Sequence, residues 1–178
     1  MRVNLKFLEL HFRKSVERIE FDHVNFFWGK IGAGKSSIAR LIDYCLGADI
    51  NLTPALQLEF VQAVLSLEVE GRRLTIYRER GSSNVVATWK EGEESLEVLV
   101  PARKAEGIAV PGTTIEVLSD LVFHLADLPA PMVRKGRRTA EPSMVRLSLR
   151  DLLRFCYIDQ DEIDSDFFRL DLEGDWVR

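Results

Sequence analysis

Cysteine and histidine are scarce in this sequence, with two cysteines and three histidines among 178 residues. Cys45 and Cys156 lie in apolar stretches and lack the C-x-x-C spacing of a metal or redox site. We therefore expect buried free thiols in a reducing compartment, with a single disulfide as the alternative. The histidines, at positions 11, 23 and 124, are too scattered to indicate a catalytic triad or a metal-ligand set.

Long apolar runs are also missing. No stretch of about 18 apolar residues occurs, and the start, MRVNLKFLEL, has no apolar segment typical of a secretion signal. We therefore predict a cytoplasmic protein with no membrane partner. The net charge of −4 excludes a polycation built for nucleic acid, although a local basic patch is compatible with it. A hydrophobic fraction of 46% suits one globular domain with a core.

Periodicity predicts strands and one helix in the first 47 residues. Apolar and polar residues alternate over residues 3–12 and 15–21, which is typical of strands. Residues 24–28, VNFFW, are nearly all apolar and are predicted to form a buried central strand. From Lys35 the apolar residues follow helical spacing, and Gly47 is a suitable end for that helix.

The middle of the chain predicts an antiparallel meander. Residues 57–80 form two alternating runs around Glu70-Gly71, and strands at 85–89 and 96–100 flank Glu91-Gly92. A helix is expected from Thr113-Thr114 to Pro129. Residues 129–143 indicate a mobile surface loop, and Ser148 with Asp151 as its capping partner predicts a last helix.

A glycine-rich loop, GKIGAGKS at residues 29–36, has the full phosphate-loop pattern G-x-x-x-x-G-K-S. Its glycines let the backbone turn tightly and point several N–H groups inward, which makes a nest for an anion. Lys35 would bring a positive charge to the β- and γ-phosphates, and the Ser36 hydroxyl would ligate Mg²⁺. The following helix adds its positive end. The motif therefore predicts binding of a nucleoside triphosphate, with ATP and Mg²⁺ as the cofactors.

Two stretches of the chain resemble the N-terminal lobe of SMC-like ATPases. These are the ABC-type heads of chromosome-maintenance, double-strand-break-repair and related bacterial defence proteins. The first stretch is FRKS at 12–15, followed after a spacer by VNFFWGKIGAGKSSIARLIDYCLG at 24–47; the second is LSLRDLLRFCYIDQDEID at 147–164. Ile31 stands where the family usually has asparagine, which removes one polar contact but leaves the nest of backbone amides intact.

The resemblance implies roles for individual residues. Lys35 and Gln160 would be catalytic, because Gln160 matches the family's Q-loop glutamine, which reaches Mg²⁺ and the attacking water. Ser36 and Gln160 would ligate the metal. The turn at residues 13–15 would contact the ribose or the base edge. The implied nucleotide-binding set is Arg13, Lys14, Ser15, Gly29, Lys30, Ile31, Gly32, Ala33, Gly34, Lys35, Ser36, Ser37 and Gln160.

The chain has no LSGG-type signature, no apolar strand ending in Asp-Glu and no coiled coil. In the family these parts lie in a C-terminal lobe, so the resemblance implies half a head. Residues 1–56 would hold the first strands, the phosphate loop and a helix, and residues 57–112 the meander. Residues 113–168 would be a helical part with the Q-loop, and residues 169–178 the start towards a coiled coil. The implied partners are the C-terminal lobe of the same ATPase, a second head that dimerises across ATP, and DNA.

Other interpretations stay open. Residues 155–158 could be a buried strand, with Asp159 as the Mg²⁺ carboxylate and Glu162 as the base of a small complete NTPase or kinase; helical spacing from Leu149 to Cys156 argues against it. Ile31 favours a module that binds nucleotide without hydrolysing it. A transporter ATPase shares the loop and the glutamine, and a GTPase would need an N-K-x-D element that the chain lacks.

The predicted fold is α/β, with a parallel core sheet that carries the phosphate loop and an antiparallel meander from residues 57 to 100. An exposed strand edge is expected if a missing lobe supplies strands. The cations RKGRR at 134–138 suit either DNA phosphates or a solvated loop. Trp28 is expected to pack in the core beneath the phosphate loop, with stacking on a base as the alternative.

Overall fold

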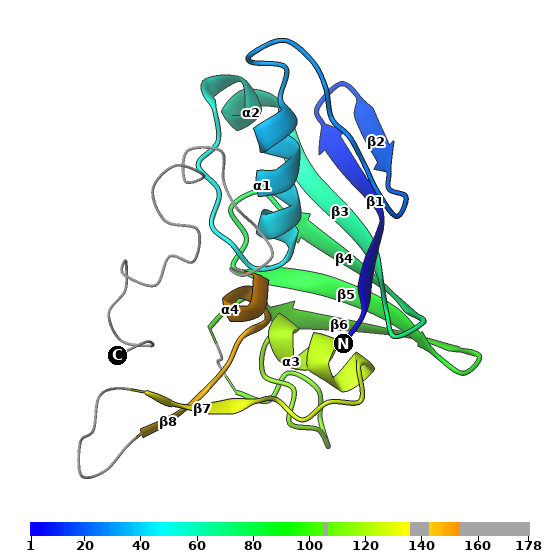
Figure 1. The fold of residues 1–178 in the computed structure, drawn as a ribbon, viewed down its shortest axis with the longest axis vertical. Coiled ribbons are helices and arrows are strands. Elements are labelled where there is room, and N and C mark those ends of the chain that lie inside the picture. The colour runs from blue at the N-terminus through cyan, green and yellow to red at the C-terminus, as the bar shows by residue number, and fades with distance from the viewer. Residues whose placement is uncertain (105–106, 136–142, 154–178) are drawn as a thin grey trace. The chain divides into compact units, whose positions relative to one another are not determined.

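A computed structural model of the chain describes residues 1–104, 107–135 and 143–153 (Figure 1). The chain divides into two compact units, Met1–Leu128 and Pro129–Arg178. The first unit holds a six-stranded sheet and three helices, and the second has a two-stranded hairpin and a short helix among its described residues.

The sheet of the first unit is antiparallel throughout. Its strands lie in the order β2-β1-β3-β4-β5-β6, and each neighbouring pair runs in opposite directions. The strands are β1 (Val3–Phe12), β2 (Val16–Glu20), β3 (Phe60–Val69), β4 (Arg72–Glu79), β5 (Asn84–Glu91) and β6 (Glu94–Pro101). The predicted strands at 3–12 and 15–21 and the predicted meander are therefore confirmed.

Local turn chemistry explains the meander. Glu70 and Gly71, which join β3 to β4, both have positive φ, at 47° and 84°, as the tightest hairpin turns require. Gly92 has φ 64° in the turn between β5 and β6. Buried residues alternate with less buried ones along β4 and β5, and the register set by the turns places Leu74 opposite Trp89, with both on the buried face.

The predicted parallel core sheet is wrong. All six strands pair antiparallel, and residues 24–28, which were predicted to be its central strand, form no strand. A parallel pair needs a second strand that runs alongside the first after a crossover connection. Among the described residues no strand plays that part for residues 24–28, so this apolar segment has nothing to pair with.

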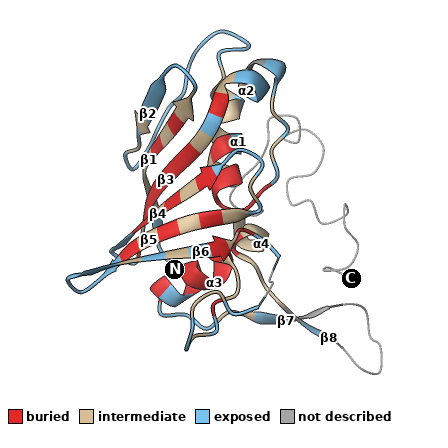
Figure 2. Cartoon of the chain, turned by 180° about the vertical axis from the view of Figure 1, so that it is seen from behind, coloured by how far each residue is buried: buried red, intermediate tan, exposed pale blue. Residues whose placement is uncertain are grey.

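Three helices complete the first unit: α1 (Lys35–Cys45), α2 (Pro54–Glu59) and α3 (Leu118–Leu125). Helix α1 confirms the helix predicted from Lys35, and Gly47 follows its end with φ 107°. The helix packs on β3 and β4 and buries Leu41, Tyr44 and Cys45 there. Figure 2 shows the buried residues concentrated along the middle strands and in parts of α1 and α3.

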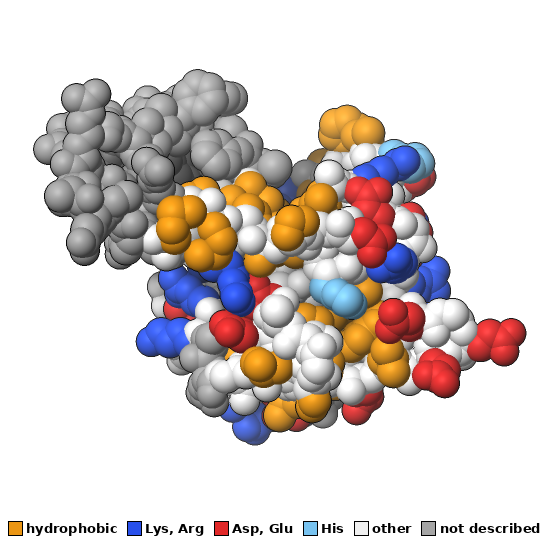
Figure 3. All heavy atoms as spheres, turned by 90° about the horizontal axis from the view of Figure 1, so that it is seen from below, with side chains coloured by type: hydrophobic (Ala, Val, Ile, Leu, Met, Phe, Trp, Pro, Cys, Tyr) orange, Lys and Arg blue, Asp and Glu red, His pale blue; other side chains and the backbone are white. Residues whose placement is uncertain are grey.

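Helix α3 starts later than predicted. Thr113 accepts from the backbone N–H of Ile115 and donates its hydroxyl to Val110 O, so it stabilises a turn before the helix. The Asp120 carboxylate instead caps the start of the helix by accepting from the backbone N–H groups of Glu116 and Val117, at 3.0 and 3.1 Å. Figure 3 looks onto the end of the unit where α3 lies, on which apolar and charged side chains are mixed.

The second unit contains β7 (Met132–Lys135), β8 (Ser143–Arg146) and α4 (Leu149–Leu153). Part of the loop predicted at 129–143 is instead strand β7, which pairs antiparallel with β8. Met132 lies opposite Arg146, and Val133 opposite Val145. The predicted cap is confirmed: Ser148 N donates to Asp151 Oδ2 at 2.8 Å, and Asp151 N donates to Ser148 Oγ at 3.2 Å. Within the described ranges, no helix has the length and apolar character needed to span a membrane.

Candidate nucleotide-binding loop

Residues 29–37 turn the chain sharply into α1. Gly32 and Gly34 have φ of 83° and 85°, in a left-handed region where residues other than glycine are strained. Gly34 is also the residue that begins the helix, and Ile38 N donates to its carbonyl at 3.1 Å. A Cβ on Gly29 would lie 3.2 Å from the Cβ of Ala33, so close approach of the chain favours glycine there as well. The glycine spacing of the motif thus follows from the backbone path of the loop.

The Lys35 side chain folds back across this loop. Its Nζ donates to Gly29 O at 2.9 Å and to Lys30 O at 3.1 Å, and the loop closes on itself through a bond from Ala33 N to Lys30 O at 3.1 Å. The ammonium group of Lys35 is thereby held across the loop by two backbone carbonyl oxygens. An oxyanion that entered the loop would meet this charge without a large movement of the side chain.

No side chain of α1 itself neutralises the partial positive charge at the start of this helix. No side chain caps the helix at Gly34, and the first turn contains no acidic residue. The first N–H groups of a helix lack partners within the helix and give that end a partial positive charge. Ser36 and Ser37 stand in this first turn, with Ser36 exposed. The predicted loop residues therefore lie together at one exposed helix start.

The segment that leads into the loop is exposed, contrary to prediction. Val24, Phe26, Trp28 and Ile31 are 69%, 87%, 93% and 104% exposed. Trp28 therefore does not pack in the core beneath the loop. We call residues 24–31 the exposed apolar segment. Phe27 is 44% exposed as well. An isolated apolar side chain on a surface is ordinary, whereas five exposed apolar side chains within eight residues form a patch of the kind often found at interaction sites.

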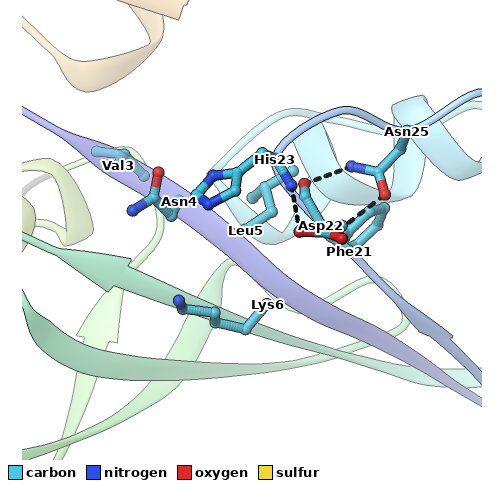
Figure 4. A pocket seen from close by; sticks show the side chains of 8 residues that line it. All are labelled: Val3, Asn4, Leu5, Lys6, Phe21, Asp22, His23 and Asn25. Atoms are coloured by element: carbon cyan, nitrogen blue, oxygen red, sulfur yellow. Dashed lines mark hydrogen bonds between the residues drawn. The ribbon is translucent and has the colours of Figure 1, made fainter.

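A turn at residues 22–25 directs the chain away from β2 and into the exposed apolar segment. Asp22 N donates to Asn25 Oδ1 at 2.9 Å, and Asn25 Nδ2 donates to Asp22 O at 2.8 Å. The turn and the start of β1 line a pocket of about 300 Å³ (Figure 4). The polar groups of the turn bond one another, as the dashed lines between Asp22, His23 and Asn25 show, and we assign the pocket no ligand.

The predicted base-contacting residues form the turn between β1 and β2. Arg13, Lys14 and Ser15 are exposed there, with Phe12 N bonded to Ser15 O at 2.8 Å and Arg13 N to Glu59 O at 2.9 Å. This turn and the start of α1 both lie at the upper end of the sheet in Figures 1 and 2. Within the described part of the chain, no hydrogen bond joins the turn to the loop.

Sequence reasoning missed the contacts that fix the far end of α1. Arg78, 4% exposed, donates through Nη1 to the carbonyl oxygens of Tyr44 and Ala48, and through Nε and Nη2 to Ser82 O at 3.1 and 3.0 Å. Its guanidinium lies 3.9 Å from the centroid of the Tyr44 ring. The sequence did indicate that Arg78 is buried, because it continues the inward alternation of Leu74 and Ile76.

Other predicted residues lie outside the described ranges. Gln160, Asp159, Glu162 and Cys156 are among them, as are residues 136–138 of the basic cluster. The described residues contain no group of three or more His, Cys, Asp or Glu side chains able to hold a metal ion. Cys45 is a buried free thiol, as predicted, and burial raises its pKa to about 12.

No protein-family model matches this sequence, and no curated protein matches it significantly.

Proposed function

We propose that residues 29–37 bind the triphosphate of ATP together with Mg²⁺, and that the chain is the nucleotide-binding lobe of an SMC-like ATPase head. The observation that supports this most directly is the loop itself. Two glycines at positive φ lead into an uncapped helix start, and Lys35 Nζ lies across the loop. Backbone amides, a helix start and a lysine are the groups that hold triphosphates in phosphate-loop proteins.

In this proposal Lys35 neutralises charge on the β- and γ-phosphates, and the Ser36 hydroxyl takes one coordination position of Mg²⁺. Gln160 completes the metal site, and residues 13–15 contact the ribose or the base. ATP supplies the phosphoryl group, and the chain's own residues bind and orient it. A lysine and backbone amides stabilise charge but do not activate water, so hydrolysis needs a carboxylate or an equivalent group near the attacking water.

The exposed apolar segment supports the proposal that a second lobe completes the head. Covering Phe26, Trp28 and Ile31 would contribute about 1.5–3 kcal/mol for each side chain fully buried. The segment adjoins the loop directly, so a partner that covered it would also lie next to the bound nucleotide. We propose that this partner is the C-terminal lobe of the ATPase, and that two heads then engage across ATP in the cytoplasm to act on DNA.

A direct binding titration tests the proposal. A fluorescent ATP analogue is titrated with Mg²⁺ against the wild type, Lys35→Ala, and Lys104→Ala, which removes an exposed lysine elsewhere. We expect saturable binding for the wild type and Lys104→Ala, and at least about tenfold weaker binding for Lys35→Ala, because a charge-assisted contact to phosphate is worth about 1.5–3 kcal/mol.

Trp28 gives an independent signal. Trp28 is exposed beside Gly29, whereas Trp89 is buried. Bound nucleotide should therefore change the tryptophan fluorescence of the wild type but not that of a Trp28→Phe variant. Equal affinity of the wild type and Lys35→Ala, or no saturable binding by either, would refute the proposed nucleotide site.

A further inference from the structure

The hairpin of β7 and β8 is a two-stranded ribbon that pairs with no other strand in the described part of the chain (Figure 1). A hairpin of two strands is only marginally stable in water by itself. A partner that binds the paired form and not the open chain would therefore stabilise the ribbon.

The charge of the ribbon is opposite to that of the whole chain. Its strands have the sequences MVRK and SMVR, in which three residues are Lys or Arg and none is acidic. The chain as a whole has a net charge of −4. A local positive patch on an acidic protein attracts a polyanion to that patch alone.

The register of the hairpin places four residues on one face. Met132 lies opposite Arg146, and Arg134 lies opposite Met144. Residues that are opposite each other, or two apart along a strand, share a face of the ribbon. Met132 and Met144 are 51% and 52% exposed, so this face is open to solvent. We call these four residues the ribbon face; the neighbouring Lys135 lies on the other face, opposite Ser143.

We propose that the ribbon face lies in the major groove of duplex DNA. The inference rests on the proposed function, in which DNA is a partner, and it names the element that contacts the DNA. A two-stranded ribbon fits the major groove of B-form DNA, which is about 12 Å wide. Arg134 and Arg146 would meet phosphate oxygens, and the two methionines would contact sugars and thymine methyl groups.

Other nucleic acids fit the ribbon less well. Proteins that bind single strands usually stack the bases on aromatic side chains, and neither strand of the hairpin contains an aromatic residue. The major groove of duplex RNA is deep and narrow, so side chains cannot reach into it. Duplex DNA therefore suits both the shape and the composition of the ribbon.

Fluorescence anisotropy of a labelled DNA duplex tests the proposal with the full chain at several salt concentrations. Arg134→Gln and Lys135→Gln form a matched pair, because each removes one positive charge from β7 but on opposite faces. We expect Arg134→Gln to bind roughly two- to fivefold more weakly, in line with one exposed charge contact. Its slope of log affinity against log salt should be shallower by about 0.9, the contribution of one phosphate contact.

Lys135→Gln should change affinity and slope less than Arg134→Gln, and Lys104→Gln, an exposed lysine of the first unit, should change neither. The far-ultraviolet circular dichroism of every variant should match that of the wild type. The titration contains no nucleotide, so Lys35→Ala should bind the duplex as tightly as the wild type. A failure of the nucleotide site would therefore leave this result unchanged.

Three outcomes would overturn the proposal. The wild type could show no saturable binding of the duplex. Arg134→Gln and Lys135→Gln could weaken binding equally, which would mean that the ribbon face does not enter the groove. Finally, a single strand or an RNA duplex of the same sequence could bind more tightly than the DNA duplex, which would reassign the ribbon to that partner.

Discussion

Replacing Arg78 tests whether the far end of α1 is anchored as the structure indicates. Arg78→Met keeps most of the side-chain stem, so it leaves only a small cavity, but it removes every N–H donor. Ala48 O and Ser82 O lose the Arg78 hydrogen bonds, whereas Tyr44 O keeps its bond from Gly47 N at 3.0 Å. The variant therefore isolates the polar contribution of the guanidinium.

The expected loss follows from three terms. A buried carbonyl left without a donor costs about 1–3 kcal/mol, and here Ala48 O is the more deeply buried of the two. The contact between the guanidinium and the Tyr44 ring contributes up to about 2 kcal/mol when desolvated. Removing a buried charge relieves a desolvation cost of several kcal/mol, which offsets part of these losses. We expect a net loss of about 3 kcal/mol, a large share of the 5–15 kcal/mol typical of a domain.

Urea unfolding followed by far-ultraviolet circular dichroism measures this loss. With a slope of about 2 kcal/mol/M, the midpoint should fall by about 1.5 M. Arg73→Met is the matched control, because Arg73 is an exposed arginine of the same strand, whereas the exposed Arg72 pairs with Asp127, and the loss from Arg73→Met should stay within about 0.5 kcal/mol. Arg78→Lys should fall between the two, since one ammonium cannot replace the planar fork. If Arg78→Met lost no more stability than Arg73→Met, the anchoring argument would be wrong.

Two further predictions concern the loop and the buried thiol. Gly34→Ala should weaken nucleotide binding about five- to thirtyfold, because a Cβ at this positive φ adds about 1–2 kcal/mol of backbone strain to the loop conformation that binds phosphate. Gly112→Ala, with a similar φ of 77° and equally open space, should lose stability but keep nucleotide affinity; equal affinities in the two variants would contradict this. Burial raises the pKa of Cys45 from 9.0 to about 12 and also raises that of Tyr44, so the unfolded chain releases these protons first as the pH rises. Stability is therefore fully present below about pH 9 and declines towards pH 12, by at most about 1.4 kcal/mol per pH unit for each group, and urea midpoints of Cys45→Ala should fall less steeply with pH than those of the wild type.

Features with local causes could be predicted from the sequence. The hairpin at Glu70-Gly71 is marked by Gly71, a residue that adopts positive φ without strain, and the alternation along β4 decides which face is buried. The start of α1 at Lys35 follows from the same glycines that define the phosphate-loop motif. The cap formed by Ser148 and Asp151 also needs only residues three apart. In each case the deciding contacts lie within a few residues of one another.

Contacts between residues far apart in the sequence could not be predicted from its periodicity. Arg78 reads as one more charged residue in a strand, and only the packed structure shows that it meets the carbonyls at the end of α1, about 30 residues earlier. Trp89 was likewise an unremarked strand residue, yet it is buried and lines a pocket with His124 and Leu125 of α3, and its N–H has no acceptor among the described residues. Composition indicates that such side chains will be buried, but the partners come from the topology of the sheet.

Residues 24–28 were wrongly predicted to be a buried strand, again because the partners of a segment are set by contacts with distant residues. An apolar run predicts burial only when some other surface is there to cover it, and a strand additionally needs a neighbour for its backbone groups. The sheet has the order β2-β1-β3-β4-β5-β6, and no described strand, the outer strands β2 and β6 included, pairs with residues 24–28. Because the glycine loop begins at the next residue, whatever covers Phe26 and Trp28 also fixes the position of that loop. Nucleotide affinity and partner binding should therefore be coupled through this segment, each strengthening the other by the same factor.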